Sequence, residues 1–522
     1  MFTKKTLTLL LAIFGSSFLF SQVRLSTAFD SGSIGSYRLL DSAWVKRGVN
    51  DSILTLSYEI ESRFDPLNPI DTALRPSARW YHFKMEGVKD KQLFLSIKNS
   101  EVIRPFYSYD GVNYTRLETG ENIYKGTINK IFTRDTVYLS HFVPYPYSRN
   151  RNKVDQWRVM PNVKHEVIGT SYLGLPIEML TITDESAKDS DKKRVWIHSR
   201  SHPSESPASW HLEAMVDIIT SDTPFGKELR KNAIFYVVPF INPDGVMGGF
   251  SRSSSTGVNI EINWDRPDSL TMPEIKILKQ TLERLTSNAP LDLLLNMHSQ
   301  ISSSVTYWIH TAESTTERFL KEQLLLSSLT INYSPYYRPV DQSFSAVAPR
   351  YFEGWIWEKF KERSVAITFE TPYTFYNQDR NGTWVSTDNL RELAHSSLYA
   401  ISDLMNLGRE MRILLDNETG KRERNWEVSN DTKNIFFGDT FFISQKEGAK
   451  IRVVSPQLER GNYELYRWVV GPADEVFPED TNVWLKVEEV KLRDSGKIRY
   501  RYKSSKKGEK IDSFLLLKRD TL

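Results

Sequence analysis

The sequence predicts an α/β fold: a mixed, mainly parallel central sheet flanked by helices, with an N-terminal β-sandwich and a small C-terminal β domain. Between residues 161 and 408, buried apolar runs alternate with amphipathic helical segments, which is typical of a sheet covered by helices. Residues 22–160 and 409–522 instead carry short β-like runs separated by turn signals. With 522 residues, the chain is long enough for several domains.

The first 21 residues have the pattern of a secretory signal peptide. Lys4 and Lys5 precede the apolar run Leu7–Phe14, and small or polar residues occur near Ser21. A membrane anchor is the alternative interpretation, but the apolar stretch is short for a spanning helix. We therefore expect cleavage near Ser21, a secreted or periplasmic location, and no membrane span after removal of the signal.

Composition and charge exclude several function classes. Removal of residues 1–21 takes away two lysines and no acids, so the formal charge of +3 falls close to neutrality. A nearly neutral chain offers no basic field for nucleic acid, and we expect no such partner. The absence of cysteine from the sequence excludes disulfides, thiolate catalysis and cysteine ligands for zinc.

The two flanking regions are predicted to be β-rich. In the N-terminal region the β-like runs are Ile53–Ile60, Trp80–Met85, Gln92–Asn99 and Asp135–Phe142. An Asp-Gly pair within Tyr107–Tyr114 lies between aromatic residues, as in a β-hairpin. In the C-terminal region the β-like runs include Asn434–Ile443, Lys450–Ser455, Tyr463–Val470, Val483–Val490 and Lys497–Lys503.

The central segment supplies strands and helices in alternation. Its strand candidates are Arg194–Arg200, Ala233–Ile241, Leu291–His298 and Ser364–Glu370. Residues Ser206–Ser221 are predicted to be a helix with Ser206 as N-cap and Pro207 in the first turn. A second amphipathic helix is expected over Pro273–Ser287.

Polar side chains follow or end each of these central strands. They are His202 and Glu205 after the first strand, Asn242 and Asp244 after the second, His298 at the end of the third, and Glu370 at the end of the fourth. Ligands of helix-flanked parallel sheets collect at the carboxyl ends of the strands, so this edge is the candidate site. Coincidence is the alternative, since strand ends are polar in most sheets.

Two histidines and a carboxylate, His202, Glu205 and His298, match a catalytic zinc site with an open position for water. Such a site needs a further carboxylate to move the proton of the water. Glu370 ends a central strand at the same edge of the sheet and could supply it. Arg252, in the loop after the Asn-Pro-Asp-Gly turn, would stabilise the oxyanion. The sequence therefore predicts one Zn²⁺ ion as cofactor.

The serines around His202 raise the alternative of a serine hydrolase. No Gly-x-Ser-x-Gly elbow is present in the sequence, and these serines fit turn and capping roles. The neighbouring His198 has Ser201 three residues later, so it cannot form the His-x-x-Glu pair and is expected to lie in a strand. We therefore do not predict a serine nucleophile.

Five motifs occur in the order of the zinc carboxypeptidase superfamily. They are HPSES (His202–Ser206), NPDGV (Asn242–Val246), GVNIEINW (Gly257–Trp264) after the Arg252 loop, DLLLNMHSQ (Asp292–Gln300) and ITFE (Ile367–Glu370). The chain resembles most the cytosolic carboxypeptidase-like branch, whose first motif is His-Pro-Gly-Glu and which carries an N-terminal β-sandwich. ARWYHFKMEG, FYSYDG and VPYPYSRN are similar to motifs of that branch, so the resemblance covers roughly residues 75–405.

The resemblance implies a role for each candidate residue. It implies that His202, Glu205 and His298 bind zinc, that Glu370 is the general base and acid, and that Arg252 stabilises the oxyanion. It also implies a peptide or peptide-like substrate. Arg350 and Tyr351 lie where the family places substrate-recognition residues and a mobile tyrosine, although a packed core tyrosine is the alternative for Tyr351.

The segment Gly257–Trp264 departs from the family motif, which reads Gly-Val-Asp-Leu-Asn-Arg or close to it. In the family the Asn-Arg pair binds the C-terminal carboxylate of the substrate through a charge-assisted fork. Here the corresponding residues are Glu261 and Ile262, and the family aspartate is Asn259. Isoleucine cannot bind a carboxylate, and glutamate repels one. The resemblance therefore does not imply that the substrate binds in the usual carboxypeptidase register, with its C-terminal carboxylate at this pair.

Several interpretations of this departure remain open at the level of sequence. Arg266 could enter the pocket and replace the missing guanidinium, or Glu261 could bind a cationic group, such as a free amine of a cell-wall peptide or a basic side chain. The substrate could also lack a carboxylate beside the scissile bond. The fourth interpretation is that Glu261 faces solvent and that a local shift of the alignment with the family motif hides the Asn-Arg pair.

These observations together predict a secreted zinc-dependent metallopeptidase that hydrolyses peptide or amide bonds. The alternative is a peptidase scaffold that has lost catalysis and binds peptides or glycans, which the altered carboxylate pocket and the two β domains would suit. The complete set of metal ligands with Glu370 favours the enzyme.

Overall fold

The structure is a computed structural model that describes residues 23–122, 124–407, 412–415, 421–431, 433–435, 440–455, 458, 461–472, 483–494 and 496–519. The expected signal peptide, residues 1–21, lies outside the described residues. The chain divides into two compact units, Met1–Ser62 with Tyr81–His141 and Arg63–Trp80 with Phe142–Leu522. None of the helices in the described ranges combines the length and apolar character needed to cross a bilayer.

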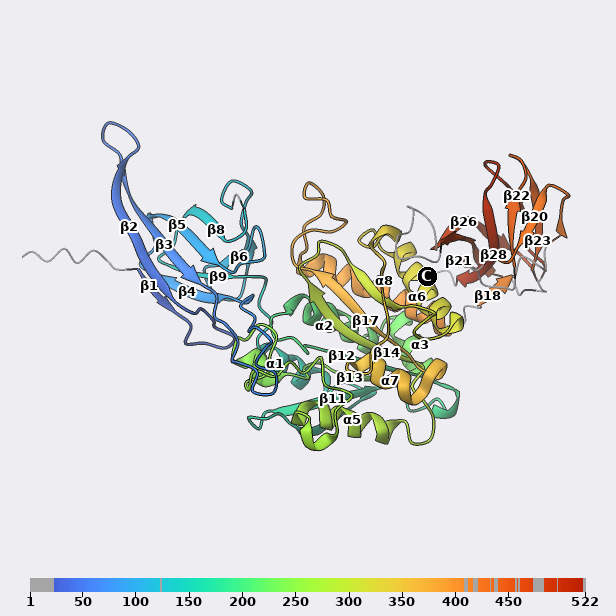
Figure 1. The fold of residues 1–522 in the computed structure, drawn as a ribbon, viewed down its shortest axis with the longest axis horizontal. Coiled ribbons are helices and arrows are strands. Elements are labelled where there is room, and N and C mark those ends of the chain that lie inside the picture. The colour runs from blue at the N-terminus through green and yellow to red at the C-terminus, as the bar shows by residue number, and fades with distance from the viewer. Residues whose placement is uncertain are drawn as a thin grey trace, which may run out of the picture. The chain divides into compact units, whose positions relative to one another are not determined.

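The first unit contains two sheets (Figure 1). One has the order β1 (Arg24–Ser26), β4 (His82–Glu86), β9 (Thr136–Ser140), β6 (Phe106–Ser108) and β7 (Thr115–Arg116). The other has the order β2 (Tyr37–Lys46), β3 (Ser52–Glu61), β5 (Gln92–Lys98) and β8 (Thr127–Ile131). Burial alternates along β5, as expected for a strand with one face on a core and one in water. The Asp-Gly turn joins the antiparallel strands β6 and β7, and Gly111 adopts the positive φ of 74° that such a turn requires.

The boundary between the units differs from the predicted boundary at residue 160. Residues 63–80 belong to the second unit because the buried carboxylate of Asp65 accepts three backbone N–H groups of the segment Ser251–Ser253. Helix α1 (Tyr147–Trp157) also belongs there, since Arg149 forms a bidentate ion pair with Glu213. These contacts join positions far apart in the sequence, so local composition did not reveal them.

The second unit is built on an eight-stranded sheet. Its order is β10 (Val163–Thr170), β11 (Pro176–Ile182), β13 (Ala233–Val238), β12 (Lys193–Ser199), β14 (Leu293–Gln300), β17 (Val365–Pro372), β15 (Thr306–His310) and β16 (Ser343–Ser345). The four middle strands β13, β12, β14 and β17 are parallel, and the pairs β10–β11, β11–β13 and β15–β17 are antiparallel. The predicted mixed, mainly parallel sheet is confirmed.

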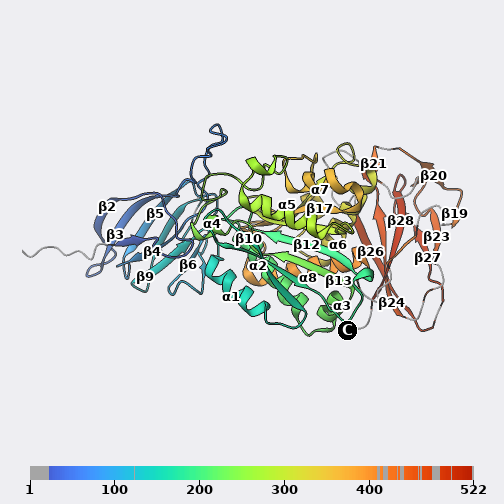
Figure 2. The same cartoon turned by 90° about the horizontal axis from the view of Figure 1, so that it is seen from below.

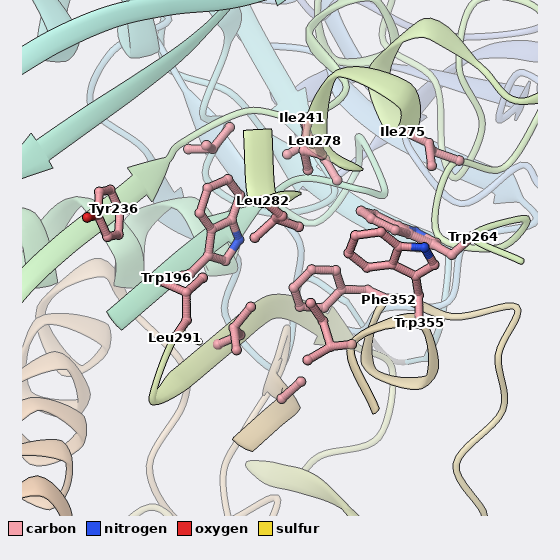
Figure 3. Packing of buried hydrophobic residues seen from close by; sticks show 14 of the residues in the cluster. Trp196, Tyr236, Ile241, Trp264, Ile275, Leu278, Leu282, Leu291, Phe352 and Trp355 are labelled. Carbon is pink, nitrogen blue, oxygen red and sulfur yellow. The ribbon is translucent and has the colours of Figure 1, made fainter. Parts of the chain in front are cut away.

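Helices cover both faces of this sheet, as predicted. Figure 2 shows α5 (Pro273–Leu285) and α7 (Phe352–Phe360) on one side, and α2 (Ser206–Thr220), α3 (Pro224–Asn232) and α8 (Thr387–Met405) on the other. Helix α6 (Glu317–Tyr333) packs against α8 and β15, and the short helix α4 (Pro243–Met247) follows β13. On the side of α5 and α7, large side chains pack into a core that includes Trp196, Leu278, Phe352 and Trp355 (Figure 3).

The face of the sheet beneath α5 and α7 changes from apolar to polar toward the carboxyl ends of its strands. Leu294 of β14 and Ala366 of β17 belong to the apolar core. Side chains alternate between the two faces of a strand, so the residues four positions further along, His298 and Glu370, lie on this same face. The parallel register pairs His298 directly with Glu370, and both therefore reach the same edge of the sheet.

The described part of the C-terminal region is all β, as predicted. One sheet has the order β20 (Trp426–Ser429), β22 (Phe441–Ser444), β28 (Lys510–Arg519), β24 (Gly461–Val469) and β26 (Val483–Leu492), and β18 (Arg412–Leu415) pairs with β28. The other strands form the sheet β19 (Lys421–Arg422), β23 (Lys450–Val454), β27 (Arg499–Lys503) and the pair β21 (Asn434–Ile435) and β25 (Gly471–Pro472). The apolar core of this C-terminal region contains Tyr463, Phe514 and Leu516.

Candidate active site

Three side chains from different elements meet at the carboxyl edge of the sheet. His202 lies in the turn after β12, Glu205 is the N-cap residue of α2, and His298 lies near the end of β14. All three are buried. The distance from Glu205 Oε1 to His202 Nδ1 is 2.8 Å, and the distance from Glu205 Oε2 to His298 Nδ1 is also 2.8 Å.

The donor atoms of this cluster fit a zinc ion. One atom from each side chain lies within 4.8 Å of the other two, and two imidazole nitrogens with one carboxylate oxygen are ligands that zinc prefers. Burial favours the neutral form of Glu205, but the charges of His202 and His298 and their hydrogen bonds outweigh it and hold the pKa of Glu205 well below its usual value. The carboxylate is thus ionised, as a metal ligand must be.

The position of Glu205 corrects the predicted start of α2. The helix begins at Ser206 with Glu205 as its N-cap residue, one residue before the predicted N-cap Ser206. The Glu205 side chain makes no capping hydrogen bond, because both carboxylate oxygens face the two histidines. Its Oε2 also accepts a hydrogen bond of 3.1 Å from the backbone N–H of Ser299, which ties α2 to β14.

The Asn-Pro-Asp-Gly turn supports the site without reaching the cluster of donor atoms. The Asn242 side chain donates to the carbonyl oxygens of Ser201 and Ser253, at 3.1 and 3.2 Å, and so joins the His202 turn to the Arg252 loop. A Cβ at Gly245 would lie 2.3 Å from Pro203, so only glycine allows the two turns to pack this closely. Asn242 therefore acts here as a structural residue.

A pocket of about 300 Å³ opens beside the cluster. Its lining contains His202, Arg252, Glu261, His298, Trp308, His310, Ser345, Ala346, Ala348, Tyr351, Glu353, Gly354, Thr368 and Glu370. Of the residues predicted for substrate binding, Glu261 and Tyr351 are in this lining, and Arg266 and Arg350 are not.

Glu370 projects into the pocket with one oxygen free. Its Oε1 accepts a long hydrogen bond of 3.4 Å from Trp308 Nε1, whereas Oε2 has no hydrogen-bond partner among the described residues. Burial, followed by the nearby charge of Glu205, raises the pKa of Glu370 to about 7. A metal cation at the cluster would favour the ionised form and lower this pKa.

Glu261 is buried beside the cluster and does not face solvent. Its Oε2 lies 3.0 Å from His298 Nε2, and its Oε1 accepts a hydrogen bond of 2.9 Å from Asn296 Nδ2. Burial alone would raise the pKa of Glu261, but the charge and hydrogen bond of His298 lower it to about 2. The neighbouring Ile262 pairs through its backbone with Tyr351.

Arg266 and Arg350 lie outside the pocket lining. Arg266 follows the turn at Asn263, where φ is +83°, and its carbonyl oxygen accepts a hydrogen bond of 2.8 Å from Lys279 of α5. Arg350 is exposed, and its guanidinium carbon lies 4.9 Å from the ring centroid of Tyr351. The Arg350 side chain also donates to the Tyr351 hydroxyl at 3.1 Å, so it contacts a residue of the pocket lining without being part of the lining.

Several residues of the site were missed from the sequence: Asn296, which donates to Glu261 and Glu353, and the pocket-lining residues Thr368, Trp308 and Glu353. Asn296 and Thr368 precede His298 and Glu370 by two residues on the same strands, so strand alternation alone would have found them. Trp308 comes from β15, and Glu353 comes from α7. The sequence around these two residues carries no motif that marks them, because only the tertiary packing brings them to the pocket.

The loop that carries Arg252 is fixed by Asp65. The Asp65 carboxylate accepts hydrogen bonds from the backbone N–H groups of Ser251, Arg252 and Ser253, at 2.6, 2.7 and 3.0 Å. On the other side, the Ser251 hydroxyl accepts from the backbone N–H of Arg79 at 2.8 Å. The backbone beneath the Arg252 side chain is therefore held from the segment 63–80.

We expect Asp65→Asn to destabilise the protein. The amide nitrogen replaces one acceptor oxygen, and each buried N–H left without a partner costs about 1–3 kcal/mol. Urea unfolding should show the lower stability, because the Arg252 loop loses part of the support from Asp65. The exposed Asp71, converted to Asn, is the matched control and should remain close to wild type. Equal stability of the two variants would contradict the role of Asp65.

Comparison with known proteins agrees with this geometry. Residues 155–354 match the family model for zinc carboxypeptidase. Cytosolic carboxypeptidase 6 of Mus musculus is 24% identical over 333 residues, which is 58% of this chain and 58% of that protein. Cytosolic carboxypeptidase 4 of Homo sapiens is 31% identical over 168 residues, covering 30% of this chain and 15% of that protein. The chain thus spans about three fifths or less of the length of these curated relatives.

Solved structures share the fold. A metallo-carboxypeptidase from Burkholderia cenocepacia superimposes with a TM-score of 0.61 at 21% identity, covering 74% of this chain and 99% of that chain. A metallo-carboxypeptidase from Pseudomonas aeruginosa gives a TM-score of 0.59 at 21% identity, again with 74% and 99% coverage. The predicted family resemblance is confirmed, and the chain carries a domain of the zinc carboxypeptidase family.

Proposed function

We propose that the protein is a zinc-dependent metallopeptidase that hydrolyses peptide or amide bonds outside the cytoplasm. The observation that supports the proposal is the convergence of a zinc-compatible cluster, a carboxylate with a free oxygen and a guanidinium on one pocket. His202, Glu205 and His298 would hold the ion. A bound zinc ion lowers the pKa of water and polarises a carbonyl group.

Glu370 is the proposed general base and acid. Its Oε2, which has no hydrogen-bond partner among the described residues, would accept the proton of the attacking water and return it to the leaving nitrogen. Trp308 Nε1 contacts the other oxygen and so orients the carboxylate. Arg252 lines the same pocket and would stabilise the negative charge that develops on the carbonyl oxygen.

The pocket favours a substrate group that is not an anion. Glu261, Glu353 and Glu370 line it with Arg252 as the one guanidinium in the lining, and Arg266 lies outside. A free carboxylate placed beside Glu261 would meet negative charge in a buried setting, which is costly. We therefore propose substrates whose scissile bond is not followed by a free carboxylate bound at Glu261 and Ile262. The location outside the cytoplasm rests on residues 1–21 alone.

A peptide panel tests this proposal. The full chain is incubated with zinc and with peptides that end in a free carboxylate, an amide or a cell-wall-type group, and products are read by mass spectrometry. We expect cleavage of the amidated or cell-wall-type peptides, its loss with a chelator, and its return when zinc is restored. Cleavage confined to free C-termini would contradict the proposed pocket. If the protein bound these peptides but neither cleaved them nor contained stoichiometric zinc, the result would favour the non-catalytic scaffold.

A further inference from the structure

We infer that Glu261 is a positioning residue of the metal centre, which holds the imidazole of His298 so that Nδ1 faces the metal. The inference rests on the proposed zinc site at His202, Glu205 and His298. It assigns the buried Glu261 a purpose different from contact with the substrate.

The two ring nitrogens of His298 are held by carboxylates from two different segments. Nδ1 lies 2.8 Å from Glu205, and Nε2 lies 3.0 Å from Glu261. Because Nδ1 is on the side of the other donor atoms, Nδ1 is the nitrogen available to a metal. Nε2 then carries the proton, and its N–H donates a hydrogen bond to the Glu261 carboxylate. This hydrogen bond fixes both the tautomer and the rotation of the ring.

Glu261 is itself held firmly enough for this task. Asn296 donates to its Oε1 at 2.9 Å, and its backbone N–H donates to Asn259 Oδ1 at 2.9 Å. The flanking residues Ile260 and Trp264 are fully buried in the apolar core beneath α5 and α7. The backbone of Glu261 is thus held by buried residues before and after it, and one of its carboxylate oxygens is held by Asn296. The carboxylate is therefore fixed in place and does not move with a substrate.

The support is unequal between the two histidines. His202 Nδ1 contacts Glu205, and His202 Nε2 has no hydrogen-bond partner among the described residues. A carboxylate that orients a metal-binding imidazole typically contributes about 10–100-fold to metal affinity. Since Glu261 is positioned to do this for His298 alone, its loss should weaken zinc binding without removing a ligand.

Glu353 provides a matched control. It is buried, it lines the same pocket, and its Oε1 accepts from the same Asn296 amide at 3.0 Å. The second donor to Glu353 Oε1 is the Thr368 hydroxyl, and no hydrogen bond joins Glu353 to His298 among the contacts of the described residues. A loss of zinc affinity that arises merely from removing a buried carboxylate near the site would therefore appear in both variants.

The experiment compares Glu261→Gln with Glu353→Gln in the full chain. The dissociation constant for zinc is measured by competition with a chromophoric chelator. We expect it to rise about 10–100-fold in Glu261→Gln and to stay near the wild-type value in Glu353→Gln. As a second readout, the Co²⁺-loaded proteins are compared by visible absorption, and the band should shift in Glu261→Gln alone because the imidazole ligand has changed its basicity and orientation.

Each outcome decides the matter. An unchanged zinc affinity and cobalt spectrum in Glu261→Gln would overturn the inference, and so would equal losses in the two variants. Failure of the wild-type chain to bind one zinc ion would instead overturn the proposed function, on which the inference rests. If Glu261→Gln does not fold, Glu261→Asp and Glu353→Asp replace the pair, and only the former should weaken zinc binding because its shorter side chain withdraws from His298.

Discussion

Replacing Glu370 by Gln should abolish peptide hydrolysis and leave zinc binding intact. The amide has nearly the shape of the carboxylate but cannot accept the proton of the attacking water. Loss of general acid–base catalysis lowers kcat by about 10²–10⁴-fold. Zinc should stay bound because Glu370 is not part of the cluster of donor atoms formed by His202, Glu205 and His298.

The measurement combines steady-state kinetics with metal analysis. Glu370→Gln should retain one zinc ion per chain, which separates a defect in proton transfer from a defect in metal binding. Glu358 is exposed on α7, so Glu358→Gln is a control for the change of charge and should keep wild-type kcat. If Glu370→Gln kept full kcat with the metal bound, another group would have to move the proton, and the proposed mechanism would be wrong.

The sequence was sufficient to predict the four parallel strands in the middle of the sheet and the edge that carries the candidate site. Apolar runs such as Ala233–Val238 and Leu293–Leu295 are long enough to mark buried strands, and the polar residues at their ends mark the carboxyl edge. Because β14 and β17 are parallel neighbours, the alternation of side chains along each strand also explains why His298 and Glu370 lie on one face of the sheet. These features depend on local sequence, which is why they were predictable.

The contacts that tune the site could not be predicted in this way. Glu261 precedes His298 by 37 residues, and Asp65 precedes Ser251 by 186 residues. Both are loop carboxylates whose neighbours in the sequence show no periodicity that points to a partner. At the sequence level, Glu261 was compatible with a cation-binding role, a solvent-facing position or repulsion of substrate, and only the packing of its loop against β14 distinguishes among these.

The three arginines predicted for the site differ in position in the structure: Arg252 lines the pocket, whereas Arg266 and Arg350 do not. From the sequence, Arg252 was expected to stabilise the oxyanion, Arg266 was one of several candidates to replace the missing guanidinium, and Arg350 was expected near the substrate. The Arg252 loop is drawn inward by Asp65, whereas Arg266 lies next to α5 through its contact with Lys279. Of the three, Arg252 alone is in the pocket lining, and the backbone that carries it is held by hydrogen bonds to the distant Asp65.

Replacing Arg252 by Gln should lower kcat by about 10²–10³-fold, the usual cost of losing one oxyanion stabiliser. Arg252 supplies the one guanidinium of the pocket lining, and its positive charge would be used most when the carbonyl oxygen becomes an anion. A group that acts chiefly in the transition state changes kcat and kcat/KM together and leaves KM nearly unchanged. Steady-state kinetics on an amidated peptide of the panel measures both parameters.

Two further variants sharpen this prediction. Arg252→Lys keeps the positive charge but loses the planar fork of donors, so its kcat should lie between those of wild type and Arg252→Gln. Arg318 is exposed on α6, with 76% of its side chain accessible, and Arg318→Gln should keep wild-type kinetics. A rise in KM with unchanged kcat in Arg252→Gln would contradict the proposed role, because it would show that Arg252 binds the ground state and the transition state equally. The charge that stabilises the oxyanion would then have to come from elsewhere in the pocket.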